Sequence, residues 1–324
     1  MTVPHPFRFG VTLEDVASVE FSTRLSGSAV AGQWAERARR AEELGYATLL
    51  VPDHLGGQLA PVPALMAAAA ATRTIRIGSL VFNNDFKHPV VLAKEVATLD
   101  LLSGGRVELG LGAGWLRGEY AHAGMAYDPP AVRIDRMAEG LTITKGLFAD
   151  GPFSFTGEHY RIDALDAQPK PLQRPHPPVL IGGGGRRLLS LAAREADSVG
   201  INVAFGSGQL DRSVGGNVTA DATDRKVTWI REAASPRFSD LELNMVMFAV
   251  VVTDQRGEAA RAVANRFGMA PEQAFTVPHF LLGTIDEIVE ELQRRREQYG
   301  VSYVIVHEDA LEAFGPVVQR LTGS

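Results

Sequence analysis

"PPVLIGGGGRRLLSLAARE" (residues 177–195) holds the strand–turn–helix unit that the rest of the chain repeats. The apolar run Val179–Gly182 predicts a strand, and its unbroken apolar character is typical of a parallel strand buried on both faces. Four glycines follow, and a helical pattern begins at Arg186. This order predicts a sheet whose parallel strands are joined by helices.

Seven other apolar runs show the same character and alternate with helical patterns. Eight strands alternating with helices predict a (β/α)8 TIM barrel with insertions at the C-terminal rim. An open, doubly wound sheet is the alternative. The other predicted strands are Phe7–Thr12, Thr48–Val51, Arg76–Phe82, Val107–Gly112, Ser198–Asn202, Asn244–Val252 and Ser302–His307.

Two of the predicted helices carry clear end signals. One has an apolar face in residues 34–44 and should end at Gly45, since glycine is favoured just after a helix. The other, "TIDEIVEELQRRREQYG" (284–300), opens with a capping box in which Glu287 follows Thr284 by three residues. Local signals therefore agree with the barrel pattern.

Composition narrows the function classes. The chain has 324 residues, 45% hydrophobic and 22% charged, which is ordinary for a globular protein. The formal net charge of -6 argues against a nucleic-acid surface, and we interpret Arg294–Arg296 as a solvated helix face. The absence of cysteine excludes disulfides and thiolate chemistry. With no signal peptide or membrane-spanning stretch evident, we expect a cytoplasmic protein without a membrane partner.

We expect residues 1–324 to form a single domain, because no linker or repeat interrupts the pattern. Three stretches exceed a minimal barrel: residues 150–178, 205–220 and 268–283. Long irregular segments in a compact domain are often functional loops. The second and third stretches are therefore candidates for a substrate pocket or lid.

The glycine run Gly182–Gly185 predicts a phosphate-binding turn. Glycines let backbone N–H groups approach an anion, and the N-terminus of the following helix adds partial positive charge. Arg186 and Arg187 can add charge-assisted hydrogen bonds. The run is not the dinucleotide fingerprint, because Arg187 stands where its third glycine would be. A merely flexible turn is the alternative.

Asp53 and His54 follow the end of a predicted strand, at the rim where barrel enzymes carry their active sites. His54 is the candidate catalytic residue, since histidine can hold or move a proton near neutral pH. The alternative is structural, with Asp53 capping a turn and His54 making a local hydrogen bond.

The segment "GLGAGW" (Gly110–Trp115) ends another strand with alternating glycines. One interpretation is close packing of the strand against its neighbours. The other is a flat cofactor ring lying against backbone at Gly112–Gly114, with Trp115 as a wall. The two are compatible.

Three other histidines are weaker candidates. His88 precedes a proline at a helix start and is interpreted as structural, and His122 and His279 show no supporting pattern. No spacing of histidines or carboxylates predicts a metal site, so we expect no metal.

Together these segments resemble the luciferase-like (bacterial luciferase) superfamily, and within it the branch that uses the deazaflavin coenzyme F420. The resemblance rests on "AEELGYATLLVPDHL" (41–55), "IRIGSLVFNNDFKHPVVLAKEVATLDLLSGGRVELGLGAGW" (75–115), "RPHPPVLIGGGGRR" (174–187) and "HFLLGTIDEIVEEL" (279–292). These segments extend over nearly the whole chain.

The resemblance implies a TIM barrel that binds a deazaflavin or flavin ring at its C-terminal rim. It also implies a non-prolyl cis peptide within Ser79, Leu80 and Val81, a bulge behind the ring. The phosphate would bind at Gly182, Gly183, Gly184 and Gly185, with Arg187 and Leu188 beginning the helix. Positions matching ring or ribityl contacts are Asp53, Asn83, Ala113, Gly114 and Trp115.

Similarity to F420-dependent glucose-6-phosphate dehydrogenases implies that His54 assists hydride transfer. Two departures argue against sugar-phosphate oxidation. Trp115 stands in place of their acidic residue after the glycine-rich turn, and Gln58 in place of their tryptophan.

The resulting hypothesis is an F420-dependent oxidoreductase that moves a hydride between deazaflavin and a small organic substrate. The alternative is an FMN-dependent luciferase-like monooxygenase with a reductase partner. A non-catalytic flavin-binding protein is the third possibility. The resemblance also implies a homodimer formed through barrel helices.

Overall fold

The computed structural model describes residues 5–13, 27–204, 208 and 217–324. The chain divides into two compact units. One comprises Met1–Leu13, Arg40–Leu49 and Gly182–Ser324, and the other comprises Glu14–Arg39 and Leu50–Ile181. The single domain expected over residues 1–324 stays a prediction.

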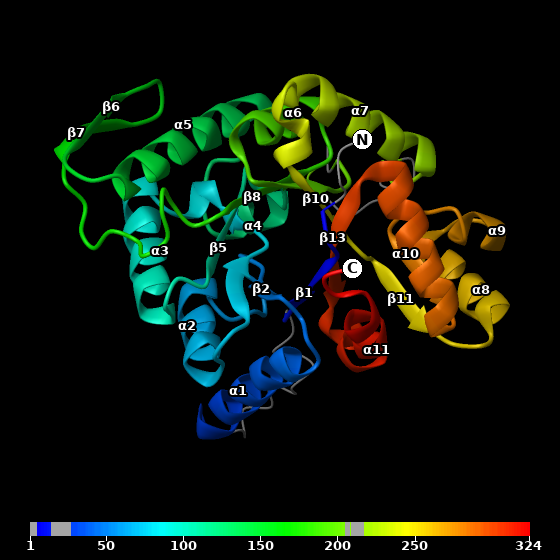
Figure 1. Cartoon of the computed structure of the whole chain (residues 1–324). Helices are drawn as coiled ribbons and strands as arrows, with labels where there is room; N and C mark the ends of the chain where they lie inside the picture. Colours follow the sequence, from blue (N-terminus) through cyan, green and yellow to red (C-terminus); the bar gives the residue numbers. More distant parts are fainter. Residues whose placement is uncertain (1–4, 14–26, 205–207, 209–216) are drawn as a thin grey trace. The chain divides into compact units, whose positions relative to one another are not determined.

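A parallel sheet has the strand order β3-β2-β1-β13-β10-β9-β8-β5-β4, and β3 also pairs with β5. Figure 1 labels β1, β2, β5, β8, β10 and β13 of this sheet. Because β3 and β4 are two pieces of one interrupted strand along β5, the sheet closes as a (β/α)8 barrel. The predicted fold class is confirmed. The strands are β1 (Arg8–Thr12), β2 (Thr48–Val51), β3 (Arg76–Ser79), β4 (Phe82–Asn83), β5 (Val107–Gly112), β8 (Val179–Gly183), β9 (Ser198–Ile201), β10 (Glu242–Val246) and β13 (Val301–His307).

Helices occupy the connections, and the two predicted end signals are present. Gly45 ends the first helix with φ of 88°, and Thr284 and Glu287 form the capping box of the tenth. The helices are α1 (Gly27–Glu43), α2 (Pro61–Ala71), α3 (Pro89–Ser103), α4 (Arg117–His122), α5 (Pro130–Phe148), α6 (Arg186–Glu195), α7 (Ala220–Ala234), α8 (Arg256–Phe267), α9 (Pro271–Ala274), α10 (Ile285–Tyr299) and α11 (Leu311–Leu321). In the described chain, no helix is long and apolar enough to span a bilayer.

The prediction of one strand over Asn244–Val252 is wrong. β10 ends at Val246, and β11 (Ala249–Val252) pairs with β12 (Phe280–Gly283) in a separate parallel sheet. The break lies at Phe248, whose N–H donates to the carbonyl of His279 at 2.9 Å. An unbroken apolar run conceals this change of partner, because the residues of both strands are apolar, although β11 is only partly buried.

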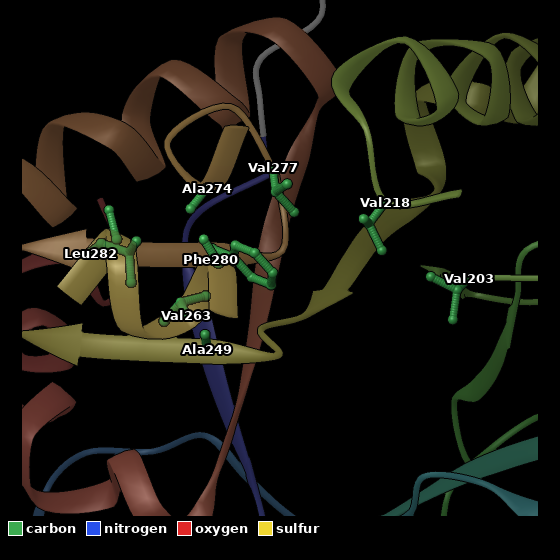
Figure 2. Close-up of a cluster of buried hydrophobic side chains, with 10 residues drawn as sticks. Val203, Val218, Ala249, Val263, Ala274, Val277, Phe280 and Leu282 are labelled. Atoms are coloured by element: carbon green, nitrogen blue, oxygen red, sulfur yellow. The ribbon is translucent and has the colours of Figure 1, made fainter. Parts of the chain in front are cut away.

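Residues 268–283, expected to be irregular, hold the short helix α9 and strand β12. Their apolar side chains join those of β11 and α8 in a buried cluster (Figure 2). This extension follows β10, at the carboxyl end of that strand. The cluster consists of Val203, Val218, Ala249, Ala260, Val263, Ala264, Ala274, Val277, Phe280 and Leu282.

The two other long stretches differ in placement. Residues 150–178 contain an antiparallel hairpin, β6 (Phe153–Thr156) and β7 (Arg161–Leu165), between α5 and β8. Gln173 Nε2 donates to the carbonyl of Val107 at the start of β5, at 2.8 Å. This stretch therefore reaches the amino-terminal end of β5, away from the catalytic rim. Within 205–220, residues 205–207 and 209–216 lie outside the described residues.

The interpretation of Arg294–Arg296 as a solvated face is wrong for Arg295. Its guanidinium is buried, pairs with Glu291 at 2.7 Å and donates to the carbonyls of Pro278 and Phe280. Consecutive residues of a helix point in different directions around its axis, so only Arg295 of the three arginines faces the protein interior. Here a buried charge caps backbone that the β12 connection leaves unpaired.

His279 is also buried, which excludes the direct catalytic role considered for it. Its Nδ1 donates to the carbonyl of Val246 at 2.8 Å, and its ring stacks on Phe248 with centroids 4.6 Å apart. Burial lowers the pKa of His279 to about 3, because a charged imidazolium loses its hydration there.

We expect His279 to make stability depend on pH in the acid range. Below the ordinary histidine pKa of about 6.5, the unfolded chain binds a proton at this residue and the folded chain does not. The free energy of unfolding therefore decreases as the pH is lowered. The expected contribution is a slope of about 1.4 kcal/mol per pH unit between pH 6 and 4. Urea unfolding of wild type and His279→Asn at several pH values measures it. Equal slopes in the two proteins would contradict the assignment.

Candidate active site

His54 lies just past the carboxyl end of β2 and is held by two residues that follow β5. Its Nδ1 is 3.0 Å from Oε2 of Glu119, and the other carboxylate oxygen accepts the N–H of Leu55 at 2.8 Å. The ring of Trp115 meets the imidazole edge-on, with centroids 5.8 Å apart. Of the two ring nitrogens of His54, only Nδ1 has a hydrogen-bond partner among the described residues. The ring is thus fixed on one side.

Asp53 joins β2 to the end of β4. Its Oδ2 accepts the backbone N–H of Asn83 at 3.1 Å. Burial raises the pKa of Asp53, while this hydrogen bond acts in the opposite direction. Asp53 therefore bridges two strands and does not cap its own turn.

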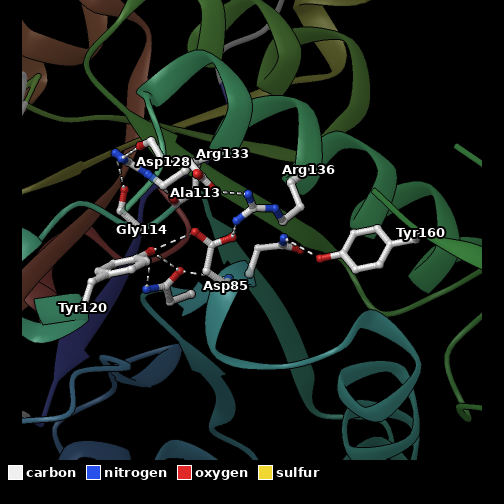
Figure 3. Close-up of polar contacts among 10 residues, drawn as sticks. Asp85, Ala113, Gly114, Tyr120, Asp128, Arg133, Arg136 and Tyr160 are labelled. Atoms are coloured by element: carbon white, nitrogen blue, oxygen red, sulfur yellow. Dashed lines mark hydrogen bonds and ion pairs between the residues drawn. The ribbon is translucent and has the colours of Figure 1, made fainter. Parts of the chain in front are cut away.

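The Asn83 side chain belongs to a polar network that supports the segment after β5 (Figure 3). Asn83 Nδ2 donates to the hydroxyl of Tyr120 at 3.1 Å, and that hydroxyl lies 3.0 Å from Oδ2 of Asp85. Arg136 pairs with Asp85 at 2.9 Å and also with Asp128. A Cβ at Gly114 would collide with the Tyr120 hydroxyl, so this position requires glycine.

The carbonyls of residues 113–115 all point at protein donors. Arg133 donates to Ala113 at 3.1 Å and to Gly114 at 3.3 Å, and the Tyr127 hydroxyl donates to Trp115 at 2.8 Å. Arg133 also lies over the Tyr127 ring, 4.0 Å from its centroid. With three carbonyls held by Arg133 of α5 and by Tyr127 of the segment between α4 and α5, the backbone of residues 113–115 forms a fixed platform.

The glycines of β5 face protein atoms. A Cβ at Gly110 would collide with the carbonyl of Ser79, and one at Gly112 would lie 2.5 Å from a methyl of Val81. Close packing therefore explains these two glycines. The Leu80–Val81 peptide bond is cis, which confirms the non-prolyl cis peptide expected within these residues.

The glycine turn belongs to the other compact unit. A Cβ at Gly184 would collide with the backbone of residues 203–204, whereas one at Gly185 would meet no described atom within 4 Å. Gly185 is the N-cap of α6, and no side chain caps that helix. Arg186 makes an exposed ion pair with Glu232 at 3.2 Å, and Arg187 is exposed. Within the described part of the chain, the turn thus leaves the N-terminus of α6 without a side-chain cap and without neighbours around Gly185.

The predicted site residues therefore fall into two sets, one in each unit. Ser79 takes part only through its backbone, since its buried hydroxyl donates to the carbonyl of Val51 at 2.8 Å. Leu188 packs over Gly183, where a Cβ would lie 2.5 Å from its side chain. The first set comprises Asp53, His54, Ser79, Leu80, Val81, Asn83, Ala113, Gly114 and Trp115, and the second Gly182, Gly183, Gly184, Gly185, Arg187 and Leu188.

Sequence reasoning missed the residues that hold the first set in place. Glu119 and Tyr120 come four and five residues after Trp115, on the short helix that follows the glycine-rich segment. That spacing was the available signal for Glu119. Asp85, Tyr127, Arg133 and Arg136 show no pattern that distinguishes them from surface charges and aromatics.

The remaining histidines lie elsewhere. His88 is the N-cap of α3 and its Nδ1 accepts the N–H of Val90 at 3.3 Å, which confirms its structural role. His122 is exposed at the end of α4. No group of three or more histidines and carboxylates in the described residues could hold a metal ion.

Comparison with known proteins gives the family. The sequence profile described as luciferase-like monooxygenase matches residues 11–304. The chain belongs to this family. An FMNH(2)-dependent dimethylsulfone monooxygenase of Pseudomonas putida is 34% identical over 131 residues, 40% of this chain and 36% of that protein. An F420-dependent glucose-6-phosphate dehydrogenase of Amycolatopsis mediterranei is 34% identical over 172 residues, 50% of each chain.

Among solved structures, the coenzyme F420 dependent tetrahydromethanopterin reductase from Methanopyrus kandleri has a TM-score of 0.76 and 18% identity, covering 98% of this chain and 100% of that one. This likeness supports the barrel fold alone. This chain spans between 36% and 65% of the length of the first curated relatives that it matches. The relatives named above are described as FMNH(2)-dependent or F420-dependent enzymes, and this chain shares their luciferase-like family.

Each compact unit separately has a feature that suits one part of a phosphorylated cofactor. Gly185 and the uncapped start of α6 leave room and N–H donors for an anion. Residues 113–115, held from behind by Arg133 and Tyr127, offer a fixed backbone surface for a planar ring. No metal is needed by either arrangement.

Proposed function

We propose that this protein is an F420-dependent oxidoreductase that moves a hydride between the deazaflavin and a small organic substrate. The observation that carries the proposal is His54, which Glu119 fixes at Nδ1 while its Nε2 has no hydrogen-bond partner among the described residues. When bound, the cofactor supplies the hydride chemistry, and the protein supplies orientation and electrostatics.

Each set of residues has a part in this proposal. Asp53, Asn83 and the platform 113–115 contact the ring, with the backbone around the Leu80–Val81 bond behind it. Gly182–Gly185 and the start of α6 bind the phosphate through backbone N–H groups. His54 accepts or donates a hydrogen bond at Nε2, next to the reacting atoms.

An FMN-dependent luciferase-like monooxygenase is the second candidate. The similarity to FMNH(2)-dependent dimethylsulfone monooxygenases supports it, and neither set of residues by itself distinguishes the two rings. We prefer F420 because a histidine paired with a carboxylate suits proton handling during hydride transfer. The proposal includes a small-molecule substrate and a cytoplasmic homodimer, without nucleic-acid or membrane partners.

Equilibrium binding to the purified apoprotein is the first test. We expect F420 to bind with a Kd in the micromolar range or tighter, followed by its fluorescence, and FMN at least about tenfold more weakly. A tenfold ratio corresponds to about 1.4 kcal/mol. Preference for FMN would overturn the proposal in favour of the monooxygenase, with oxygen uptake as the next assay. Binding without turnover of any alcohol or carbonyl substrate would indicate a non-catalytic flavin-binding protein.

A further inference from the structure

Glu119 uses both carboxylate oxygens on the segment that carries His54. One lies 3.0 Å from Nδ1 of the imidazole, and the other accepts the backbone N–H of Leu55 at 2.8 Å. The Glu119 side chain is 12% exposed and that of His54 27%. Glu119 therefore holds both the ring and the backbone that carries it.

The partner decides which nitrogen of a neutral imidazole holds the proton. An ionised carboxylate accepts hydrogen bonds and cannot donate them, so Nδ1 of His54 must carry the hydrogen. The lone pair of the neutral ring is then on Nε2. A hydrogen bond from one ring nitrogen to a carboxylate is a common way to fix a histidine tautomer.

We propose that Glu119 is a positioning residue that keeps the proton of neutral His54 on Nδ1 and leaves Nε2 as the acceptor toward the reacting group. The part of His54 at that group rests on the proposed function. The tautomer itself depends only on the contacts of this chain.

Two other polar neighbours of His54, Asp53 and Trp115, do not accept the hydrogen on Nδ1. Asp53 precedes His54 directly, but its Oδ2 is engaged with the N–H of Asn83 at 3.1 Å. Trp115 meets the imidazole edge-on and has only an N–H to offer, which cannot accept a proton from Nδ1. Its ring limits rotation of the imidazole away from Glu119.

The position of Glu119 on helix α4 explains how its carboxylate is held next to His54. It lies in the first turn of α4, and its own N–H donates to the carbonyl of Leu116 at 3.1 Å. The next residue, Tyr120, is anchored to Asn83 and Asp85. The same short helix therefore fixes both the platform after β5 and the carboxylate that holds His54.

The direct test is the tautomer of His54 in the apoprotein, read from long-range ¹H–¹⁵N correlation spectra of ¹⁵N-histidine-labelled protein at pH 8. The signal is assigned by its loss in His54→Asn. We expect a protonated Nδ1 and an unprotonated Nε2 in wild type. In Glu119→Gln, whose amide can also donate, we expect a mixture of tautomers.

Glu139→Gln is the matched control. Glu139 also accepts backbone N–H groups, those of Glu158 at 2.8 Å and of His159 at 3.0 Å, and none of its hydrogen bonds in the described residues is to an imidazole. We expect it to lower stability without changing the His54 spectrum. For Glu119→Gln we expect at least a tenfold lower kcat with the Kd of F420 changed less than about threefold, since a tenfold loss is about 1.4 kcal/mol.

A wild-type spectrum with the proton on Nε2, or one that Glu119→Gln leaves unchanged, would overturn the positioning role. The wild-type spectrum decides this even where the variant fails to fold. Because it is recorded without cofactor, it is independent of the proposed function. Failure of F420 to bind wild type would instead count against the F420 proposal and leave the tautomer result intact.

Discussion

His54→Asn is expected to lower kcat/KM for the F420-dependent reaction by about a hundredfold to ten-thousandfold, the usual contribution of a positioned acid or base. Asparagine can place its amide nitrogen near the position of Nδ1 and still donate to Glu119. The substitution therefore removes Nε2 while keeping the contact that holds the segment. Steady-state kinetics, together with the Kd of F420 by fluorescence, measures both consequences.

The same substitution at another histidine provides the control. His88 caps α3 through Nδ1, and asparagine is also a favourable N-cap, so His88→Asn should retain wild-type kinetics. We expect the Kd of F420 for His54→Asn to stay within about threefold of wild type, below 1 kcal/mol. A variant with near wild-type kcat/KM would exclude His54 from the chemistry, whatever its affinity for cofactor.

The barrel could be predicted because its signal is repeated and local. Each parallel strand is apolar on both faces, so strands such as Thr48–Val51 and Val107–Gly112 have the predicted bounds. The same property concealed the break after Val246, because β10 and β11 are both apolar although they belong to different sheets and β11 is only partly buried. Hydrophobic pattern reports burial, whereas the partner of a strand depends on residues far away in the chain.

In the candidate site too, some residues could be predicted from the sequence and others could not. Asp53 and His54 could be predicted, since polar residues just after a buried strand are unusual and their position at the rim follows from the fold. Glu119 could not be assigned a role in the same way, because its contact with His54 joins segments 65 positions apart. A carboxylate in a short helix is ordinary by sequence and becomes significant only through that distance.

The residues that support the site from α5 were the hardest to predict from the sequence. Arg133 and Arg136 lie on α5 among other charged residues, yet they hold the carbonyls of the platform and the carboxylate of Asp85. Charged side chains of long helices usually face solvent, which is also why Arg295 was misjudged. Which arginine turns inward depends on unpaired carbonyls and carboxylates in other elements, and these are fixed only when the chain has folded.

The glycine run allows a test of phosphate binding that separates it from folding. Gly185→Val places a side chain at the uncapped start of α6, where a Cβ meets no described atom within 4 Å, with a backbone conformation (φ −94°, ψ 146°) that valine adopts readily. We expect Tm to fall by no more than a few degrees, because valine is only a poorer N-cap than glycine. We expect the Kd of F420 to rise about tenfold to hundredfold, the effect of losing a hydrogen bond to a charged group.

Gly257→Val provides the matched comparison. Gly257 lies in the first turn of α8, in the same unit, and a Cβ there also meets no described atom within 4 Å. It should leave both Tm and the Kd nearly unchanged, measured by thermal unfolding and by fluorescence. Unchanged F420 affinity in Gly185→Val would place the phosphate elsewhere and reduce the glycine run to a packing feature, explained by the approach of Gly184 to residues 203–204. Loss of affinity with an intact fold would leave anion binding as the reason for an open, uncapped helix start.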